Sequence, residues 1–144
     1  MTRIQAPVAL AARLMLAAIF VLEGWFKIAD YDGTLRYMAD HGVPGPLLPL
    51  AITMELGGGL LVAFGFLSRV SATALAGFCL LTALIFHANF GDADQLIHFY
   101  KNIAIAGGFL ALAAFGPGNW SVDALRARRM PMRPSPAQAA GQPV

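Results

Sequence analysis

The sequence predicts an all-α integral membrane protein, folded as an antiparallel bundle of four helices. Of its 144 residues, 58% are hydrophobic and only 12% are charged, which is too apolar for an ordinary soluble protein. Four stretches are apolar enough to cross a bilayer, which takes about 20 residues of helix. The few ionisable residues in these stretches fall where antiparallel threading would gather them near one membrane face. We therefore expect the lipid bilayer to be the main surrounding of the chain.

The first predicted crossing covers residues 8–28 and begins just after Pro7, which the first turn of a helix tolerates. Glu23 and Lys27 interrupt the far end of this apolar run, and no small-x-small cleavage site follows it. A secretory signal peptide would need such a site. We therefore expect a retained membrane helix and not a cleaved leader.

The second and third crossings are predicted over residues 47–67 and 70–90. Glu55 is the only charge in the second, and the third holds no formal charge other than one that His87 would carry when protonated. Only Ser68 and Arg69 separate these two segments, so they must be antiparallel neighbours.

The fourth crossing is predicted over residues 97–115. Its apolar part, residues 103–115, is too short to span a bilayer alone and must borrow the preceding turns, including His98 and Lys101. The sequence Gly116-Pro117-Gly118 then ends the helix.

Two shorter helices and a tail are predicted outside the crossings. One helix begins at Asp32, stops near Gly42 and is expected to cover the mouth of the bundle. A second, capped by Ser121, is predicted to lie at the membrane interface and to end near Met130. Residues 131–144 are rich in Pro, Ala and Gln, which predicts a disordered cytoplasmic tail beyond a four-helix domain of residues 1–130.

Basic residues give the predicted orientation. The side of the bundle that holds both termini carries most of the arginines: Arg3, Arg13, Arg69, Arg126, Arg128, Arg129 and Arg133. Lys27, Arg36 and Lys101 belong to the other side. The positive-inside rule therefore places both termini in the cytoplasm. A basic tail beside a membrane meets anionic lipid or sets topology, so no nucleic-acid partner is expected.

Composition also limits the chemistry. Cys79 is the only cysteine, so the chain has no second sulfur of its own for thiol–disulfide exchange. His87, His98, Asp92 and Asp94 lie close in sequence, but their spacing matches no known zinc or iron signature. No metal site is predicted.

The central prediction is a polar pocket in the outer half of the bundle, where Glu23, Glu55, His87 and Lys101 would share one cavity. Glu23 and Lys27 are four residues apart with the acid first, which favours an ion pair within the helix. That pair alone is explained equally well as mutual neutralisation near the headgroups.

Glu55 is the stronger signal, because no basic residue lies within a turn of it and three glycines follow at Gly57, Gly58 and Gly59. Its charge state depends on whether Lys27 or Lys101 from another helix comes within pairing distance. Two interpretations stay open: a Glu55–Lys101 bridge that holds two helices together, or a proton donor and acceptor for a bound molecule.

The chain resembles the DoxX family of small four-helix bacterial membrane proteins. The resemblance covers roughly residues 10–125. It is carried by Leu14 with Phe20, Glu23-Gly24-Trp25-Phe26-Lys27-Ile28, Gly42-Val43-Pro44, Glu55-Leu56-Gly57-Gly58-Gly59, Gly65 before Arg69, Phe86-His87, Lys101-Asn102-Ile103-Ala104, Gly107-Gly108 and Gly116-Pro117-Gly118-Asn119-Trp120-Ser121-Val122-Asp123. It implies a multi-pass protein of the bacterial inner membrane. Members of this family are linked variously to thiosulfate oxidation with quinone as acceptor and to redox-stress complexes, so the resemblance implies fold and location more firmly than a reaction.

Three functions follow as hypotheses. The first is a quinone-linked redox subunit, with Glu23 or Glu55 supplying protons and His87 or Lys101 stabilising charge. Its expected cofactor is a quinone, in contact with Trp25, Lys27, Phe86 and Asn102. The second is a non-enzymatic anchor or assembly partner for a redox complex. The third is a small transporter. A redox protein subunit and a second copy of the chain are the expected protein partners.

Overall fold

The computed structural model describes residues 4–129, and this part of the chain is helical with no strand. The elements are α1 (Gln5–Ala29), α2 (Tyr31–Asp40), the 3-10 turn η1 (Gly45–Leu47), α3 (Leu48–Ile52), the π-helical turn η2 (Thr53–Gly57), α4 (Gly58–Phe64), α5 (Ser68–Phe86), α6 (Ala93–Phe115) and α7 (Val122–Arg129). Four segments are long and apolar enough to cross a membrane: α1, the continuous run Gly45–Phe64, α5 and α6. The predicted all-α membrane bundle is therefore confirmed.

The observed helix ends differ from the predicted ones for local reasons. The third span begins at Ser68 instead of residue 70 and ends at Phe86 instead of residue 90. Gly65 adopts the left-handed conformation (φ 68°) that ends α4, so the turn before α5 precedes Ser68 and Arg69. The fourth span begins at Ala93, earlier than residue 97, because Asp92 caps it by accepting a hydrogen bond from the Asp94 amide at 2.9 Å.

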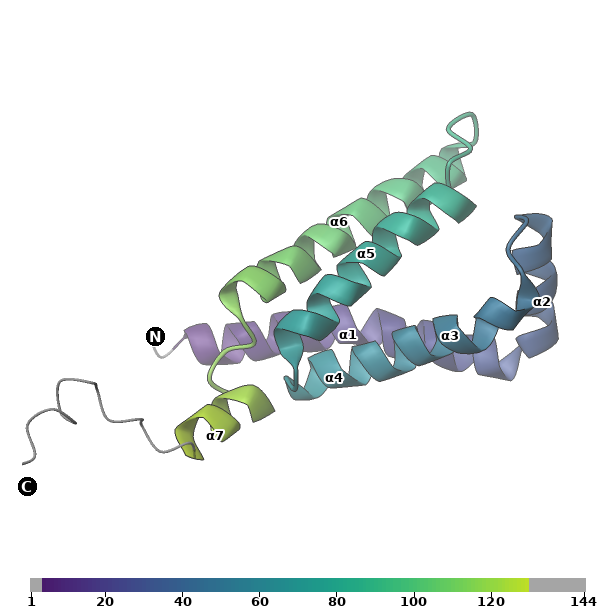
Figure 1. The fold of residues 1–144 in the computed structure, drawn as a ribbon. Coiled ribbons are helices and arrows are strands. Elements are labelled where there is room, and N and C mark those ends of the chain that lie inside the picture. The colour runs from purple at the N-terminus through teal and green to yellow at the C-terminus, as the bar shows by residue number, and fades with distance from the viewer. Residues whose placement is uncertain (1–3, 130–144) are drawn as a thin grey trace, which may run out of the picture.

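The spans form two pairs, which we call arms. One arm contains α1 packed along α3, η2 and α4, and the other contains α5 packed along α6 (Figure 1). The arms touch mainly where α4 meets α5, and they diverge away from that contact. We call the end where α1 and α5 begin the terminal end, and the end that carries α2 and residues 87–92 the cavity end.

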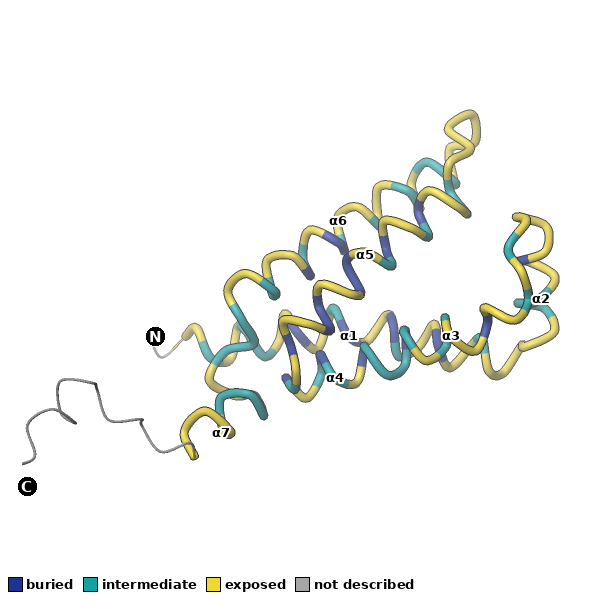
Figure 2. Tube along the Cα trace, viewed as in Figure 1, coloured by how far each residue is buried: buried dark blue, intermediate teal, exposed yellow. Residues whose placement is uncertain are grey.

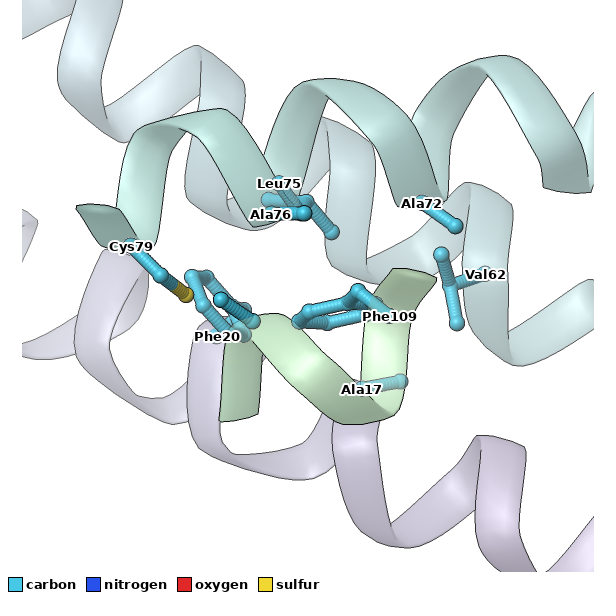
Figure 3. Packing of buried hydrophobic residues seen from close by; sticks show 9 residues of the cluster. Ala17, Phe20, Val62, Ala72, Leu75, Ala76, Cys79 and Phe109 are labelled. Carbon is cyan, nitrogen blue, oxygen red and sulfur yellow. The ribbon is translucent and has the colours of Figure 1, made fainter. Parts of the chain in front are cut away.

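The hydrophobic core lies where the arms meet. Phe20 of α1 and Phe109 of α6 pack edge to face, with ring centroids 5.2 Å apart. Small residues of α5, Ala72 and Ala76, are buried beside them and let the helices approach closely (Figure 3). Most of the outer surface of the four spans is exposed (Figure 2), and many of the exposed side chains are large and apolar, as expected for surfaces that face lipid tails.

The terminal end is closed by Arg13 of α1, whose side chain is only 2% exposed. Its guanidinium donates to the backbone oxygens of Ala63 at 3.2 Å, Pro117 at 2.7 Å and Trp120 at 2.8 Å. One side chain thus connects α1, α4 and the loop after α6. Arginine suits this task because its planar group carries five donors.

The helix α7 packs onto the same end. Ser121 caps it, as predicted, by accepting from the Ala124 amide at 3.2 Å. Asp123 accepts from the Leu67 and Ser68 amides at 2.9 Å each, and from the Ser68 hydroxyl at 2.8 Å. These bonds satisfy amides at the start of α5 that have no partner within the helix. The predicted tail, residues 131–144, lies outside the described residues.

At the cavity end, α2 stands beside the opening between the arms (Figure 1). It begins at Tyr31, one residue before the predicted start, because the Asp30 side chain accepts from the Gly33 amide at 3.1 Å and so caps the helix. Its Met38 is buried, and this residue anchors the helix against the bundle.

Candidate functional site

A cavity of about 750 Å³ lies between the diverging arms at the cavity end. Residues of α1, α2, α3, η2, α5 and α6 line it, and most of its wall is apolar. Its polar lining residues are Glu23, Lys27, Thr34, Tyr37, Glu55, Thr82, His87, His98, Lys101 and Asn102. A volume of this size with few polar groups is typical of a site for a small organic molecule.

Glu55 is the most deeply placed of the acids, with 5% of its surface exposed. It lies in the π-helical turn η2, an irregularity within a span that the sequence predicts as one regular helix. Such turns add a residue to the helix and are frequent at functional sites. Gly24 allows α1 to pack directly against η2, because a Cβ at this position would lie 2.8 Å from Leu56 Cγ and 3.0 Å from the Leu56 amide nitrogen.

Lys27 joins two carboxylates. Its Nζ lies 3.0 Å from Oε2 of Glu55 and 3.2 Å from Oε2 of Glu23. The predicted pair within α1 is therefore present, but the alternative Glu55–Lys101 bridge is wrong. Because Gly24 lets α1 pack directly against η2, Lys27 of α1, and not Lys101 of α6, pairs with Glu55. Among residues 4–129, Lys101 forms no ion pair.

The α5–α6 arm contributes a second polar group. His87 follows the last residue of α5, and its Nδ1 lies 2.8 Å from the Gln95 side-chain oxygen. Its ring stacks on His98 with centroids 5.1 Å apart. Asn102 donates its amide to the His98 backbone oxygen at 3.1 Å. These contacts hold three polar side chains on the α5–α6 arm, whereas the Glu55–Lys27 pair belongs to the other arm.

An aromatic group forms the wall beside α2. Tyr37 stacks on Phe86 of α5 with centroids 5.4 Å apart and an interplanar angle of 16°, and His41 lies 5.1 Å from the same ring. Burial raises the pKa of the Tyr37 hydroxyl above its ordinary value, against a smaller opposing effect of the Lys27 charge. Tyr37 is therefore neutral at physiological pH and able to donate a hydrogen bond.

The structure gathers the predicted site residues at this cavity with one exception. Glu23, Lys27, Glu55, Phe86, His87, Lys101 and Asn102 all line it. Trp25 does not, and 60% of its surface is exposed on the outside of α1. The catalytic and binding roles assigned to these residues stay predictions.

Sequence reasoning did not single out Tyr37 as a site residue and placed His98 only in the rejected metal cluster. Tyr37 lies one helical turn after Thr34, which also lines the cavity, and beside the buried Met38. The periodicity of α2 was thus a usable signal.

Comparison with known proteins gives the family. The sequence model of the DoxX family matches residues 8–88, which is more than half of the chain. The chain belongs to the DoxX family. The matched residues include Glu23, Lys27, Glu55 and His87, whereas Lys101 and Asn102 lie beyond them.

Two Escherichia coli (strain K12) relatives of this DoxX protein are similar over most of their length. The inner membrane protein YqjF is 51% identical over 116 residues, covering 81% of this chain and 89% of the relative. The inner membrane protein YphA is 40% identical over 121 residues, covering 79% and 86%. No solved structure matches the chain. Both relatives are inner membrane proteins, in agreement with the four membrane-spanning segments found here.

Proposed function

We propose that this DoxX protein is a quinone-linked redox subunit of the bacterial inner membrane, with the quinone ring bound in the cavity between the arms. The observation that carries the proposal is the buried Glu55, ion-paired to Lys27 at the wall of an otherwise mostly apolar cavity. Burying a titratable pair inside a membrane domain costs free energy, so such pairs are rare and usually mark a functional site. A quinone requires such groups, because its reduction consumes two electrons and two protons.

The residues of the chain divide these tasks. Glu55 and Glu23 hold and deliver protons, since both carboxylates lie against the Lys27 ammonium and border the cavity. Lys27 and Lys101 stabilise negative charge on a carbonyl oxygen. Tyr37 and Asn102 border the same space and carry hydrogen-bond donors that orient the ring. The electrons come from a partner redox protein.

A binding measurement tests this proposal. The purified protein in lipid nanodiscs is titrated with decylubiquinone, and empty nanodiscs correct for partitioning into lipid. We expect saturable binding, weakened about tenfold, or about 1.4 kcal/mol, by Glu55→Leu. Asp94→Asn is the control, because Asp94 is exposed at the start of α6 and does not line the cavity, and its effect is expected to be less than twofold. Absence of binding above the empty nanodiscs would refute the proposal.

One observation favours the second candidate, a non-enzymatic anchor. The Glu55–Lys27 contact ties η2 to α1 and is itself an explanation for both charges. Removing one partner of a buried pair typically costs about 3–5 kcal/mol, because the other charge is left alone, while replacing both costs much less.

A double-mutant cycle separates the two candidates. If the pair is purely structural, Lys27→Met lowers the free energy of unfolding. The double variant Lys27→Met/Glu55→Leu then restores both this free energy and the binding of the partner redox complex. If the pair serves quinone chemistry, the double variant regains stability without regaining decylubiquinone binding. Unfolding in detergent, followed by circular dichroism, gives the stabilities.

A further inference from the structure

We propose that the cavity is reached sideways from the bilayer, through a gap between α3 and α5 that holds the apolar tail of the bound molecule. The ligand would be an amphipath that carries a polar ring on a long alkyl or isoprenoid tail. This inference rests on the proposed function for the nature of the ring. The gap itself is argued from the described residues alone, and we call it the side gap: Leu50 and Ala51 of α3 with Ala74, Gly77 and Leu81 of α5.

The cavity lining continues onto the lipid-facing surface at this place. Leu50 and Leu81 both line the cavity, yet they are 62% and 55% exposed. Ala74, Gly77 and Leu81 follow one another at spacings of three and four, so they form one stripe along α5. Because cavity-lining residues of α3 and α5 are exposed, the cavity opens to the surface between them, within the spans that are expected to face lipid tails.

Small residues keep the side gap open. A Cβ placed on Gly77 would meet no atom within 4 Å, although Gly77 is the middle residue of α5 and lines the cavity. Leu75 lies two residues nearer the terminal end than Gly77 and closes the space there. Its side chain lies 3.1 Å from where a Cβ on Gly58 of α4 would stand. The gap therefore ends where α4 meets α5.

The other boundary between the arms suits a polar group and not a tail. The lining residues of α1 and α6 include the polar Glu23, Lys101 and Asn102 beside the apolar Ile19, Phe20 and Ile105, whereas the residues of the side gap are all apolar. An alkyl chain there would desolvate charged side chains without offering them partners, which is unfavourable. The ring of the ligand is thus directed toward Lys27 and Glu55, and the tail leaves on the apolar side through the side gap.

The test blocks the side gap with a bulky side chain. Gly77→Trp fills the open space, and Ala74→Phe, one turn away on the same stripe, is a second block. Gly107→Trp is the matched control, because Gly107 is exposed in the α6 span, has no atom within 4 Å of its Cβ position and does not line the cavity.

Two photoreactive probes are used in nanodiscs, both with a dodecyl chain that carries a diazirine. One has a benzoquinone head and the other a plain hydroxyl head. We expect both chains to label residues 50–54 and 74–81, as mapped by mass spectrometry. Gly77→Trp and Ala74→Phe should reduce this labelling at least fivefold, whereas Gly107→Trp should leave it unchanged.

The outcomes distinguish the two proposals. If the hydroxyl probe labels the side gap but excess decylubiquinone fails to compete, the gap stands and the quinone proposal fails. If the quinone probe labels only α1 and α6, or if the blocking variants label as the wild type does, the side gap is refuted whatever the quinone result. A tailless benzoquinone should bind the Gly77→Trp variant within twofold of the wild type, and a tenfold loss would also refute the tail assignment.

Discussion

Arg13 shows how much a single residue contributes to this bundle. Its three hydrogen bonds to backbone oxygens come from one almost fully buried guanidinium. A lysine keeps the charge but offers a single nitrogen, which cannot reach three oxygens on different segments.

We therefore expect Arg13→Lys to lower the free energy of unfolding by about 3–6 kcal/mol, since hydrogen bonds to charged groups contribute about 1.5–3 kcal/mol each and two of the three are lost. Thermal or chemical unfolding in detergent micelles measures the loss. Arg36→Lys is the control, because Arg36 is exposed on α2, and it should change stability by less than about 0.5 kcal/mol. Equal effects of the two substitutions would show that the three hydrogen bonds of Arg13 do not stabilise the fold.

The sequence identifies residues that matter here but not their partners. Arg13 lies inside an apolar run, and counting charges assigns it to membrane orientation alone. Glu55 stands out because it is an isolated acid before three glycines, yet its partner is Lys27 and not Lys101. Position along a span follows from residue number, but the direction in which a side chain points depends on helix rotation, and the π turn at Thr53–Gly57 changes that rotation.

At the scale of elements, Asp123 links α7 to the first turn of α5. Burial by itself would raise the pKa of this carboxyl, but the hydrogen bonds from Ser68 and Leu67 and the charge of Arg126 outweigh it, so the pKa lies below the ordinary 3.8. Protonation is therefore harder in the folded protein than in the unfolded chain. The stabilisation is complete above the unfolded pKa and is lost as the pH falls through the folded pKa.

We expect Asp123→Ala to cost about 1 kcal/mol at neutral pH, a usual value for losing a helix cap. The difference in unfolding free energy between wild type and variant should stay constant down to the ordinary pKa of 3.8 and shrink below it, because the wild type then loses the same bonds. Asp40→Asn, at the exposed end of α2, is the control and should show no such convergence. A difference that stays constant down to pH 3 would contradict the capping role.

Element boundaries were predictable where the capping chemistry is local. Ser121 caps α7 as its position before an amphipathic segment indicates, and the Gly116-Pro117-Gly118 sequence does end α6. The third span is predicted to extend to residue 90, but α5 ends at Phe86 and His87 is its C-cap. His87 and Gln95 instead bond to each other and close the loop. That contact is tertiary, and no local pattern encodes it.

At the scale of the whole molecule, the divergence of the two arms creates the cavity. Hydropathy predicts four crossings and their antiparallel order, but a uniform bundle would leave no such space. The large rings of Phe20 and Phe109 fill the core where α1 meets α6, whereas a Cβ on Gly77, in the middle of α5, would meet no atom within 4 Å. The distribution of side-chain volume along the helices thus sets the splay, and it becomes evident only once the facing residues are known.

A small aromatic group joins α2 to the α5–α6 arm at the cavity end. The rings of Tyr37 and His41 pack on Phe86, and this aromatic group is the direct ring contact between α2 and α5 within residues 4–129. Ring pairs of this kind contribute about 0.5–1.5 kcal/mol each beyond the area that they bury. Because α2 otherwise packs mainly on α1 and η1, loss of the rings removes its ring contact with α5 and should make local opening of α2 easier.

We expect Phe86→Ala to loosen α2, so that amide hydrogen exchange over residues 31–40 becomes about tenfold faster, corresponding to roughly 1.4 kcal/mol of lost contact. Where exchange proceeds by opening of α2 alone, the free energy of global unfolding should fall by less than the free energy of this local opening. Phe90→Ala is the matched control, because Phe90 packs on Phe99 with centroids 5.1 Å apart and makes no ring contact with α2. If both variants accelerate exchange in residues 31–40 equally, or neither does, α2 is held by its contacts with α1 and the aromatic group does not act as its latch.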